Sequence, residues 1–287
     1  MSRSKAESLR NLQTRSDSAM RPFQFHKITS HAAKSRVLND AVAPTFMAGG
    51  LTLVPRMRAR EEAPTDVLDV TDMPGMRDIE ITEMRFRLGA AVTHTDVVES
   101  VDLSKVCPAM ITLAATIGDR HIQNRGTIGG SIARNDPASD YPAALIALNA
   151  IVETDARSIA AADFFEGPFK TALEDGELIT AVSFDIPTAS AYVKFPYPAN
   201  GYAMVGIFLA RHQHSVAVAV NGAGRHGVFR LNQLEQRLNE NFTLDVVSDL
   251  DLSSFDILED RHGPRAYREN LIRVMAQRAI AQCATDL

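Results

Sequence analysis

Apolar residues fall into short runs along the chain, and the first of these runs alternate between helical and extended spacing. A helical pattern near residues 31–40 precedes an apolar strand at 45–48, and a second strand is predicted at 66–69. A helical turn through residues 55–57 lies between the two strands. This order is typical of a small βαβ unit, which we assign to residues 20–75.

The middle of the chain, residues 76–188, mixes predicted strands with predicted helices. Asp140 followed by Pro142 predicts the start of a helix, because a carboxylate caps a first turn in which proline is tolerated. The spacing of apolar residues predicts strands at 86–90, 149–154 and 178–186 and helices at 95–99 and 105–118.

The last part of the chain, residues 189–287, follows a cluster of prolines and has the pattern of an α+β domain. Apolar runs at 202–211 and 215–222 predict consecutive strands of a three- to four-stranded antiparallel sheet, joined by a polar turn. Helices are predicted at 231–239 and after Pro264. The final helix carries an apolar stripe of Tyr267, Leu271, Val274, Met275, Ala279 and Cys283, which predicts packing against a core or in an interface.

Composition narrows the classes of function. The chain has 287 residues, 45% of them hydrophobic, and a net charge of −5 without a basic stripe, which argues against nucleic-acid binding. No apolar run approaches the roughly 18 residues of a membrane helix, and no secretory signal is evident, so a cytoplasmic location is expected. Its two cysteines, Cys107 and Cys283, are too few to hold an iron–sulfur cluster. Residues 1–19 are polar and predict a flexible extension.

Two glycine-rich segments carry the candidate chemistry. Residues 48–55 read Ala-Gly-Gly-x-x-Leu-x-Pro, and residues 125–132 read Arg-Gly-Thr-Ile-Gly-Gly-x-Ile. Paired glycines allow tight turns and close approach of a ligand, and successive N–H groups in such turns can bind an anion. Neither segment has the pattern of a P-loop or of a Rossmann unit. The residues alone therefore indicate anion-binding loops, with ordinary turns as the alternative.

A third motif follows at residues 136–142, Asp-Pro-x-x-Asp-x-Pro. In this order the three motifs resemble the medium, FAD-binding subunit of molybdenum hydroxylases, the family of carbon monoxide dehydrogenase and xanthine dehydrogenase. The resemblance extends over about residues 20–285. It implies an α+β chain with a two-subdomain FAD-binding fold of the PCMH/vanillyl-alcohol-oxidase type, divided at 20–75 and 76–188, and a C-terminal domain at 189–287.

The resemblance also implies which residues contact FAD. One side of the diphosphate would be held by the first segment and the other side by the second, and four further residues would lie along the cofactor. The implied contacts are Ala48, Gly49, Gly50, Leu51, Thr52, Thr127, Ile128, Gly129, Gly130, Ser131, Asp140, Ile179, Lys194 and Tyr202.

Several of these residues have plainer alternatives. Asp140 can be read as only a helix cap, Lys194 as a solvated side chain and Tyr202 as strand packing. Leu51 and Ser131 depart from the family pattern, which has threonine or histidine and asparagine there. His212 and His214 are interpreted as part of a solvated turn rather than as metal ligands.

The implied function is electron transfer. Substrate would be hydroxylated at a molybdopterin site on a large subunit, and electrons would pass through two [2Fe-2S] clusters on a small subunit to FAD on this chain and then to an external acceptor. The expected assembly is a dimer of heterotrimers, with no catalytic acid–base pair and no metal site on this chain. The alternatives are a stand-alone flavin oxidoreductase of the same fold and an assembly subunit whose flavin site has decayed.

Overall fold

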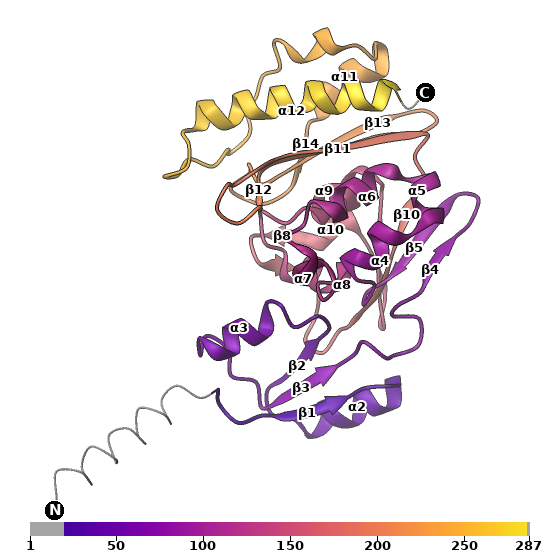
Figure 1. Cartoon of the computed structure of the whole chain (residues 1–287), viewed down its shortest axis with the longest axis vertical. Helices are drawn as coiled ribbons and strands as arrows, with labels where there is room; N and C mark the ends of the chain where they lie inside the picture. Colours follow the sequence, from indigo (N-terminus) through magenta and orange to yellow (C-terminus); the bar gives the residue numbers. More distant parts are fainter. Residues whose placement is uncertain (1–19, 286–287) are drawn as a thin grey trace, which may run out of the picture. The chain divides into compact units, whose positions relative to one another are not determined.

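A computed structural model of the chain describes residues 20–285 (Figure 1). Contacts between residues divide it into two compact units, Met1–Met73 and Pro74–Leu287. The predicted flexible extension, residues 1–19, lies outside the described residues. No helix within residues 20–285 combines the length and the apolar character that crossing a bilayer requires.

The first unit contains a three-stranded parallel sheet in the order β1-β3-β2. Ser30 caps the first helix, since its hydroxyl accepts a hydrogen bond from the Ala33 N–H. The predicted βαβ pattern is confirmed, and the structure adds a first strand. The elements are β1 (Gln24–Lys27), α2 (His31–Asp40), β2 (Pro44–Met47), α3 (Leu53–Arg58) and β3 (Asp66–Asp69).

The second unit begins with a five-stranded antiparallel sheet in the order β4-β5-β10-β6-β7. Phe86 and Phe184 stack across its centre with ring centroids 4.7 Å apart. The strands are β4 (Ile79–Ile81), β5 (Arg85–Gly89), β6 (Ile151–Thr154), β7 (Ser158–Ala160) and β10 (Ile179–Asp185), with a small hairpin of β8 (Phe165–Gly167) and β9 (Lys170–Thr171). The helices are α4 (His94–Glu99), α5 (Val101–Val106), α6 (Pro108–Ala115), α7 (Arg120–Gln123), α8 (Ile128–Arg134), α9 (Tyr141–Ala147) and α10 (Ala161–Phe164).

The prediction of one helix over residues 105–118 is wrong. The chain forms two helices, α5 and α6, which meet at Cys107. Proline lacks an N–H and its ring obstructs a preceding helical turn, so Pro108 ends the first helix and starts the second.

The C-terminal part contains a four-stranded antiparallel sheet in the order β11-β12-β13-β14, which confirms the predicted sheet. Its strands are β11 (Ala189–Pro196), β12 (Ala203–Arg211), β13 (Val216–Asn221) and β14 (Phe229–Arg230). They are followed by α11 (Asn232–Glu240), the 3-10 helix η1 (Leu244–Val247) and α12 (Arg265–Thr285).

Both faces of this sheet are covered. Helices α11 and α12 pack against one face of the sheet and form an apolar core with it. Helices α6 and α9 contact strands β11, β12 and β13 on the other face (Figure 1). Every residue of β12 except Arg211 is therefore buried. The predicted stripe of α12 lies in or against this core, with the exception of Tyr267, which is exposed.

Candidate cofactor site

The first glycine segment forms an open turn between β2 and α3. Gly50 has a φ of +75°, a left-handed conformation that favours glycine. The N–H groups of Gly50, Leu51 and Thr52 have no acceptor among residues 20–285, and the latter two residues are exposed. Three consecutive unpaired donors at the start of a helix fit an anionic group such as a phosphate.

The second glycine segment starts helix α8 and is not an open loop. Thr127 is the N-cap, and its hydroxyl accepts a hydrogen bond of 3.1 Å from the Gly130 N–H. The N–H groups of Ile128, Gly129 and Ser131 donate to backbone carbonyls at 2.9–3.1 Å. Thr127 itself is buried, so a ligand would meet the half-buried Ser131 here rather than free main-chain amides. Contact of Ile128, Gly129 and Gly130 with FAD stays a prediction.

The three glycines of this segment serve different purposes. A Cβ atom at Gly126 would lie 2.5 Å from Nε2 of His94, and one at Gly129 would lie 2.6 Å from both Cβ and O of Ala90. These two glycines are needed for packing inside the protein. A Cβ at the exposed Gly130 would meet only the Thr127 hydroxyl, at 3.0 Å. Packing inside the protein therefore does not explain the glycine at position 130, and its contact with FAD stays a prediction.

Asp140 lies at the start of α9 but its side chain caps no N–H, so the helix-cap alternative is wrong. One carboxylate oxygen accepts a hydrogen bond from the Tyr192 hydroxyl, and the other lies 3.2 Å from the Lys194 ammonium. Lys194 also donates to the Thr116 carbonyl at 2.8 Å. The side chains of Asp140 and Lys194 are 5% and 4% exposed, so the pair is buried and the solvated-lysine alternative is also wrong.

Burial affects the ionisation of the carboxyl group of Asp140. It raises the pKa of Asp140 above the ordinary aspartate value, while the charge of Lys194 and the hydrogen bond from Tyr192 act in the opposite direction. Burial, followed by the charge of Asp140, raises the pKa of the Tyr192 phenol well above its usual value, so this hydroxyl stays protonated and can donate. The arrangement provides fixed charge and hydrogen-bond donors in a dry environment.

The remaining predicted residues differ in exposure. Tyr202 precedes β12 and is 47% exposed, so it is not a packed strand residue. Its pKa is raised by partial burial and then by the charges of Asp136 and Asp140. Ile179 begins β10 and is buried, and its contact with a cofactor stays a prediction.

Sequence reasoning missed Tyr192 and Asn221. The Asn221 amide donates to the Ser139 carbonyl at 2.9 Å and so holds the turn before Asp140. A Cβ atom at Gly206 would lie 2.3 Å from Asn221 Oδ1 and 2.7 Å from the Tyr192 hydroxyl, which explains the glycine there. Tyr192 could have been found from its strand, because residues two apart, Tyr192 and Lys194, share a face.

A second buried contact connects the glycine segment with α9. His94 Nδ1 lies 3.1 Å from the Tyr141 hydroxyl, and the backbone N–H of His94 donates to the Gly126 carbonyl at 3.0 Å. Burial lowers the pKa of His94 to about 4, so the ring is neutral at pH 7. His94 thus supports both Gly126 and the residue that follows Asp140.

The turn at residues 212–214 carries two histidines, and one of them contacts the end of helix α9. His212 Nε2 lies 3.0 Å from the Ala147 carbonyl. Within residues 20–285, no three His, Cys, Asp or Glu side chains are grouped as metal ligands.

Replacing one partner of the buried pair is expected to destabilise the chain more than replacing both. Lys194→Met should lower the free energy of unfolding by about 3–5 kcal/mol, because it leaves the Asp140 carboxylate buried without its countercharge. The double variant Asp140→Asn, Lys194→Met should recover much of this loss. Urea unfolding at pH 7 measures both, and a single variant as stable as the wild type would contradict the buried pairing.

Comparisons with known proteins identify the family. Residues 21–189 match the model of the FAD binding domain in molybdopterin dehydrogenase. The chain is 32% identical to the nicotine 6-hydroxylase medium subunit of Paenarthrobacter nicotinovorans, over 83% of this chain and 88% of the relative. It is 29% identical to the glyceraldehyde dehydrogenase medium chain of Sulfolobus acidocaldarius, over 86% of this chain and 92% of the relative.

The fold agrees with these sequence matches. The structure of reconstituted CO dehydrogenase from Oligotropha carboxidovorans superposes with a TM-score of 0.82 and 26% identity, covering 93% of this chain and all of that one. The predicted fold class is thereby confirmed. The chain belongs to the family of FAD-binding domains of molybdopterin dehydrogenases, as an FAD-binding oxidoreductase subunit of the molybdenum hydroxylase type.

Proposed function

We propose that this chain transfers electrons within a heterotrimeric molybdenum hydroxylase. A large subunit would carry molybdopterin and hydroxylate the substrate, and a small subunit would carry two [2Fe-2S] clusters. The chain would connect those clusters to an external acceptor, in a cytoplasmic dimer of heterotrimers. The relatives support this assignment, since their names identify them as medium chains or subunits.

The observation that carries the proposal is the set of three unpaired N–H groups at Gly50, Leu51 and Thr52. Such donors suit the FAD diphosphate because successive backbone N–H groups can bind an anion without any side chain having to gain or lose a proton. The hydroxyl of Ser131 would add a donor from the second segment, whose first helical turn Thr127 caps. The buried pair of Asp140 and Lys194 would orient the polar middle of the cofactor, with Tyr202 beside it.

The chain's own residues bind and orient rather than react. FAD takes up electrons singly and releases them singly or in pairs, which suits a connection between one-electron clusters and varied acceptors. The protein contributes fixed donors, a buried ion pair and a packed scaffold. Each of these would determine the position of the cofactor or the electrostatic potential around it.

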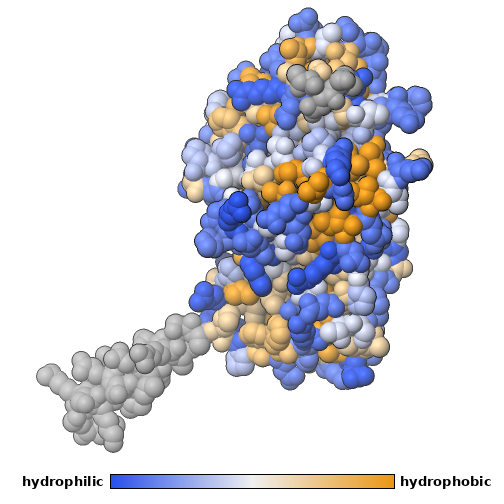
Figure 2. Space-filling view, turned by 45° about the vertical axis from the view of Figure 1, so that its right-hand side comes forward, coloured by the Kyte–Doolittle hydropathy of each residue, from blue (hydrophilic) through white to orange (hydrophobic). Residues whose placement is uncertain are grey.

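The surface also suits a subunit of a larger assembly. On the face drawn in Figure 2, apolar side chains gather in one area among polar ones. A contiguous apolar patch on a surface, unlike single exposed apolar side chains, is typical of a site that binds a partner.

Purification of the tagged chain from its native host tests the proposal. The expected result is a complex with two further polypeptides, one carrying molybdenum and one carrying iron and acid-labile sulfide, and a flavin absorbance near 450 nm. A chain that purifies alone with FAD and oxidises a small substrate by itself would favour the stand-alone oxidoreductase. A chain without flavin in an otherwise loaded complex would favour a decayed site.

A further inference from the structure

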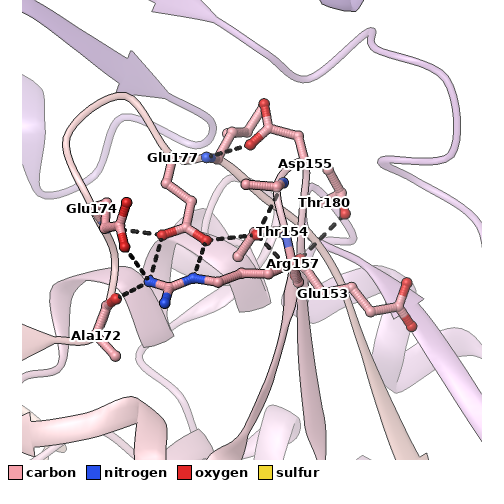
Figure 3. Close-up of polar contacts among 10 residues, drawn as sticks. Glu153, Thr154, Asp155, Arg157, Ala172, Glu174, Glu177 and Thr180 are labelled. Atoms are coloured by element: carbon pink, nitrogen blue, oxygen red, sulfur yellow. Dashed lines mark hydrogen bonds and ion pairs between the residues drawn. The ribbon is translucent and has the colours of Figure 1, made fainter.

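A buried carboxylate organises the turn that leads into strand β10 (Figure 3). The two oxygens of Glu177 accept hydrogen bonds of 3.0 Å each from Nε and Nη2 of Arg157. They also accept from the Thr154 hydroxyl at 2.7 Å and from the Glu174 N–H at 2.8 Å. The side chain of Glu177 is 3% exposed and that of Arg157 is 43% exposed. This bidentate pair, Arg157–Glu177, is saturated with donors.

The pair fixes both ends of the turn. Arg157 Nη2 donates to the Ala172 carbonyl at 2.7 Å, so the guanidinium holds the start of the turn as well as Glu177. At the other end, the Leu178 N–H donates to the Asp155 carboxylate and the Leu178 carbonyl accepts from the Asp155 N–H, both at 3.0 Å. Residues 172–178 are therefore tied to the β6–β7 hairpin at several points.

The turn continues into a β-bulge. Ile179 is opposite Thr154 and Ala181 is opposite Glu153, so Thr180 is the extra residue on β10. The Thr180 hydroxyl donates to the Glu153 carbonyl at 3.2 Å. Bulges bend a strand and often lie beside functional sites, where they set the direction of a side chain. Here the bulge sets the position of Ile179, one of the predicted FAD contacts.

The bulge is connected to the second glycine segment through one residue. The Ala90 N–H donates to the Thr180 carbonyl at 2.9 Å, and the Ala90 carbonyl accepts from the Gly129 N–H at 2.9 Å. Ala90 is also the residue that a Cβ at Gly129 would strike. A shift of the bulge therefore moves Ala90 and, with it, the edge formed by Gly129 and Gly130.

We propose that Arg157 and Glu177 are positioning residues for FAD, which fix the bulge at Thr180 and, through Ala90, the second glycine segment. This inference rests on the proposed flavin site. The two residues need not touch the cofactor, and they act by holding the groups that do. Loss of the pair would loosen Ile179 and Gly129 together.

The chain contains a matched control, the Arg230–Glu235 pair of the C-terminal domain. Arg230 Nε donates to Glu235 Oε1 at 2.9 Å, and Arg230 Nη2 donates to Glu235 Oε2 at 2.8 Å. Glu235 also accepts a hydrogen bond of 2.8 Å from the Val218 N–H. The side-chain exposures of Glu235 and Arg230 are 9% and 42%. The two pairs thus match in bidentate geometry, in burial and in one backbone N–H donor to the carboxylate, and the control holds a helix to a different sheet.

The test compares Arg157→Gln and Glu177→Gln with Arg230→Gln and Glu235→Gln in the full chain. Apo-protein stability is measured by urea unfolding, and FAD affinity by quenching of FAD fluorescence. Loss of the residues that support metal ligands typically weakens metal affinity about 10–100-fold; by analogy, we expect at least about tenfold weaker FAD binding for the first two variants. The control variants should lose similar stability and stay within about twofold of the wild type in affinity. Arg157→Lys should restore part of the affinity.

Each outcome decides one question. Equal affinity loss in both pairs, or none in either, would overturn the positioning role while leaving the flavin site in place. Should a glutamine variant fail to fold, Thr154→Val removes one donor to Glu177 and gives the same comparison in a milder form. If the wild-type chain binds no FAD, the proposed function fails instead.

Discussion

Alanine at position 129 should lower the free energy of unfolding by about 2–4 kcal/mol and abolish FAD binding. Its Cβ atom would lie 2.6 Å from the Ala90 carbonyl oxygen, and backbone cannot move aside as a flexible side chain can. Overpacking of this kind costs about 1–3 kcal/mol, and the strained Gly129–Ala90 hydrogen bond adds about 1 kcal/mol. Urea unfolding and FAD titration of Gly129→Ala measure the two effects.

Gly130→Ala is the control, and its expected behaviour is different. Position 130 is exposed and helical, so alanine should change the free energy of unfolding by less than about 1 kcal/mol. Its methyl group would nevertheless occupy the face that a ligand approaches, and FAD affinity should fall at least about tenfold, or 1.4 kcal/mol. Unchanged affinity in Gly130→Ala would show that the cofactor does not lie against this segment.

Stability should fall as the pH drops from about 6.5 to about 4, because His94 resists protonation in the folded chain. The pKa of His94 is lowered from 6.5 to about 4 by burial. Below pH 6.5 His94 binds a proton in the unfolded chain but not in the folded chain. Proton binding therefore stabilises the unfolded state relative to the folded state. Integrated over this window, the loss amounts to about 3 kcal/mol. Urea unfolding at intervals of half a pH unit measures it.

Two comparisons isolate the contribution of His94. His94→Gln should flatten the pH dependence between about 6.5 and 4.5, whereas the exposed His121→Gln should leave it unchanged. Glu177, whose pKa is lowered to about 2 by its bond to Arg157, loses its stabilisation only below its unfolded value of about 4.5. A pH profile of His94→Gln that parallels the wild type would remove His94 as the cause.

Sequence patterns predicted the helices and strands that are specified by residues close together in the sequence. The valines alternating in 215–222 gave β13 within one residue, and the signal for α12 after Pro264 was equally direct. Helix α8 was missed because the glycine pair at 129–130 suggested a turn. The stronger signal was Thr127, whose hydroxyl caps the helix three residues before Gly130.

The candidate site was predictable only in part. The motifs and the family resemblance pointed to Asp140 and Lys194, but they did not predict that the two side chains form a buried ion pair. Tyr192 reaches Asp140 across 52 residues of sequence, and Asn221 reaches Ser139 across 82. Such contacts depend on strand register and on the helices that cover the sheet, which no local pattern encodes.

The covering of the C-terminal sheet on both faces limits how the chain can be divided. Strands β11, β12 and β13 lie against α6 and α9 on one side and the terminal helices on the other. A truncated protein ending near residue 188 would leave the apolar sides of α6 and α9 open to water, and an isolated 189–287 fragment would expose the opposite surface of its strands. Biosynthesis must therefore proceed through strand β13 before α6 and α9 can acquire their native packing.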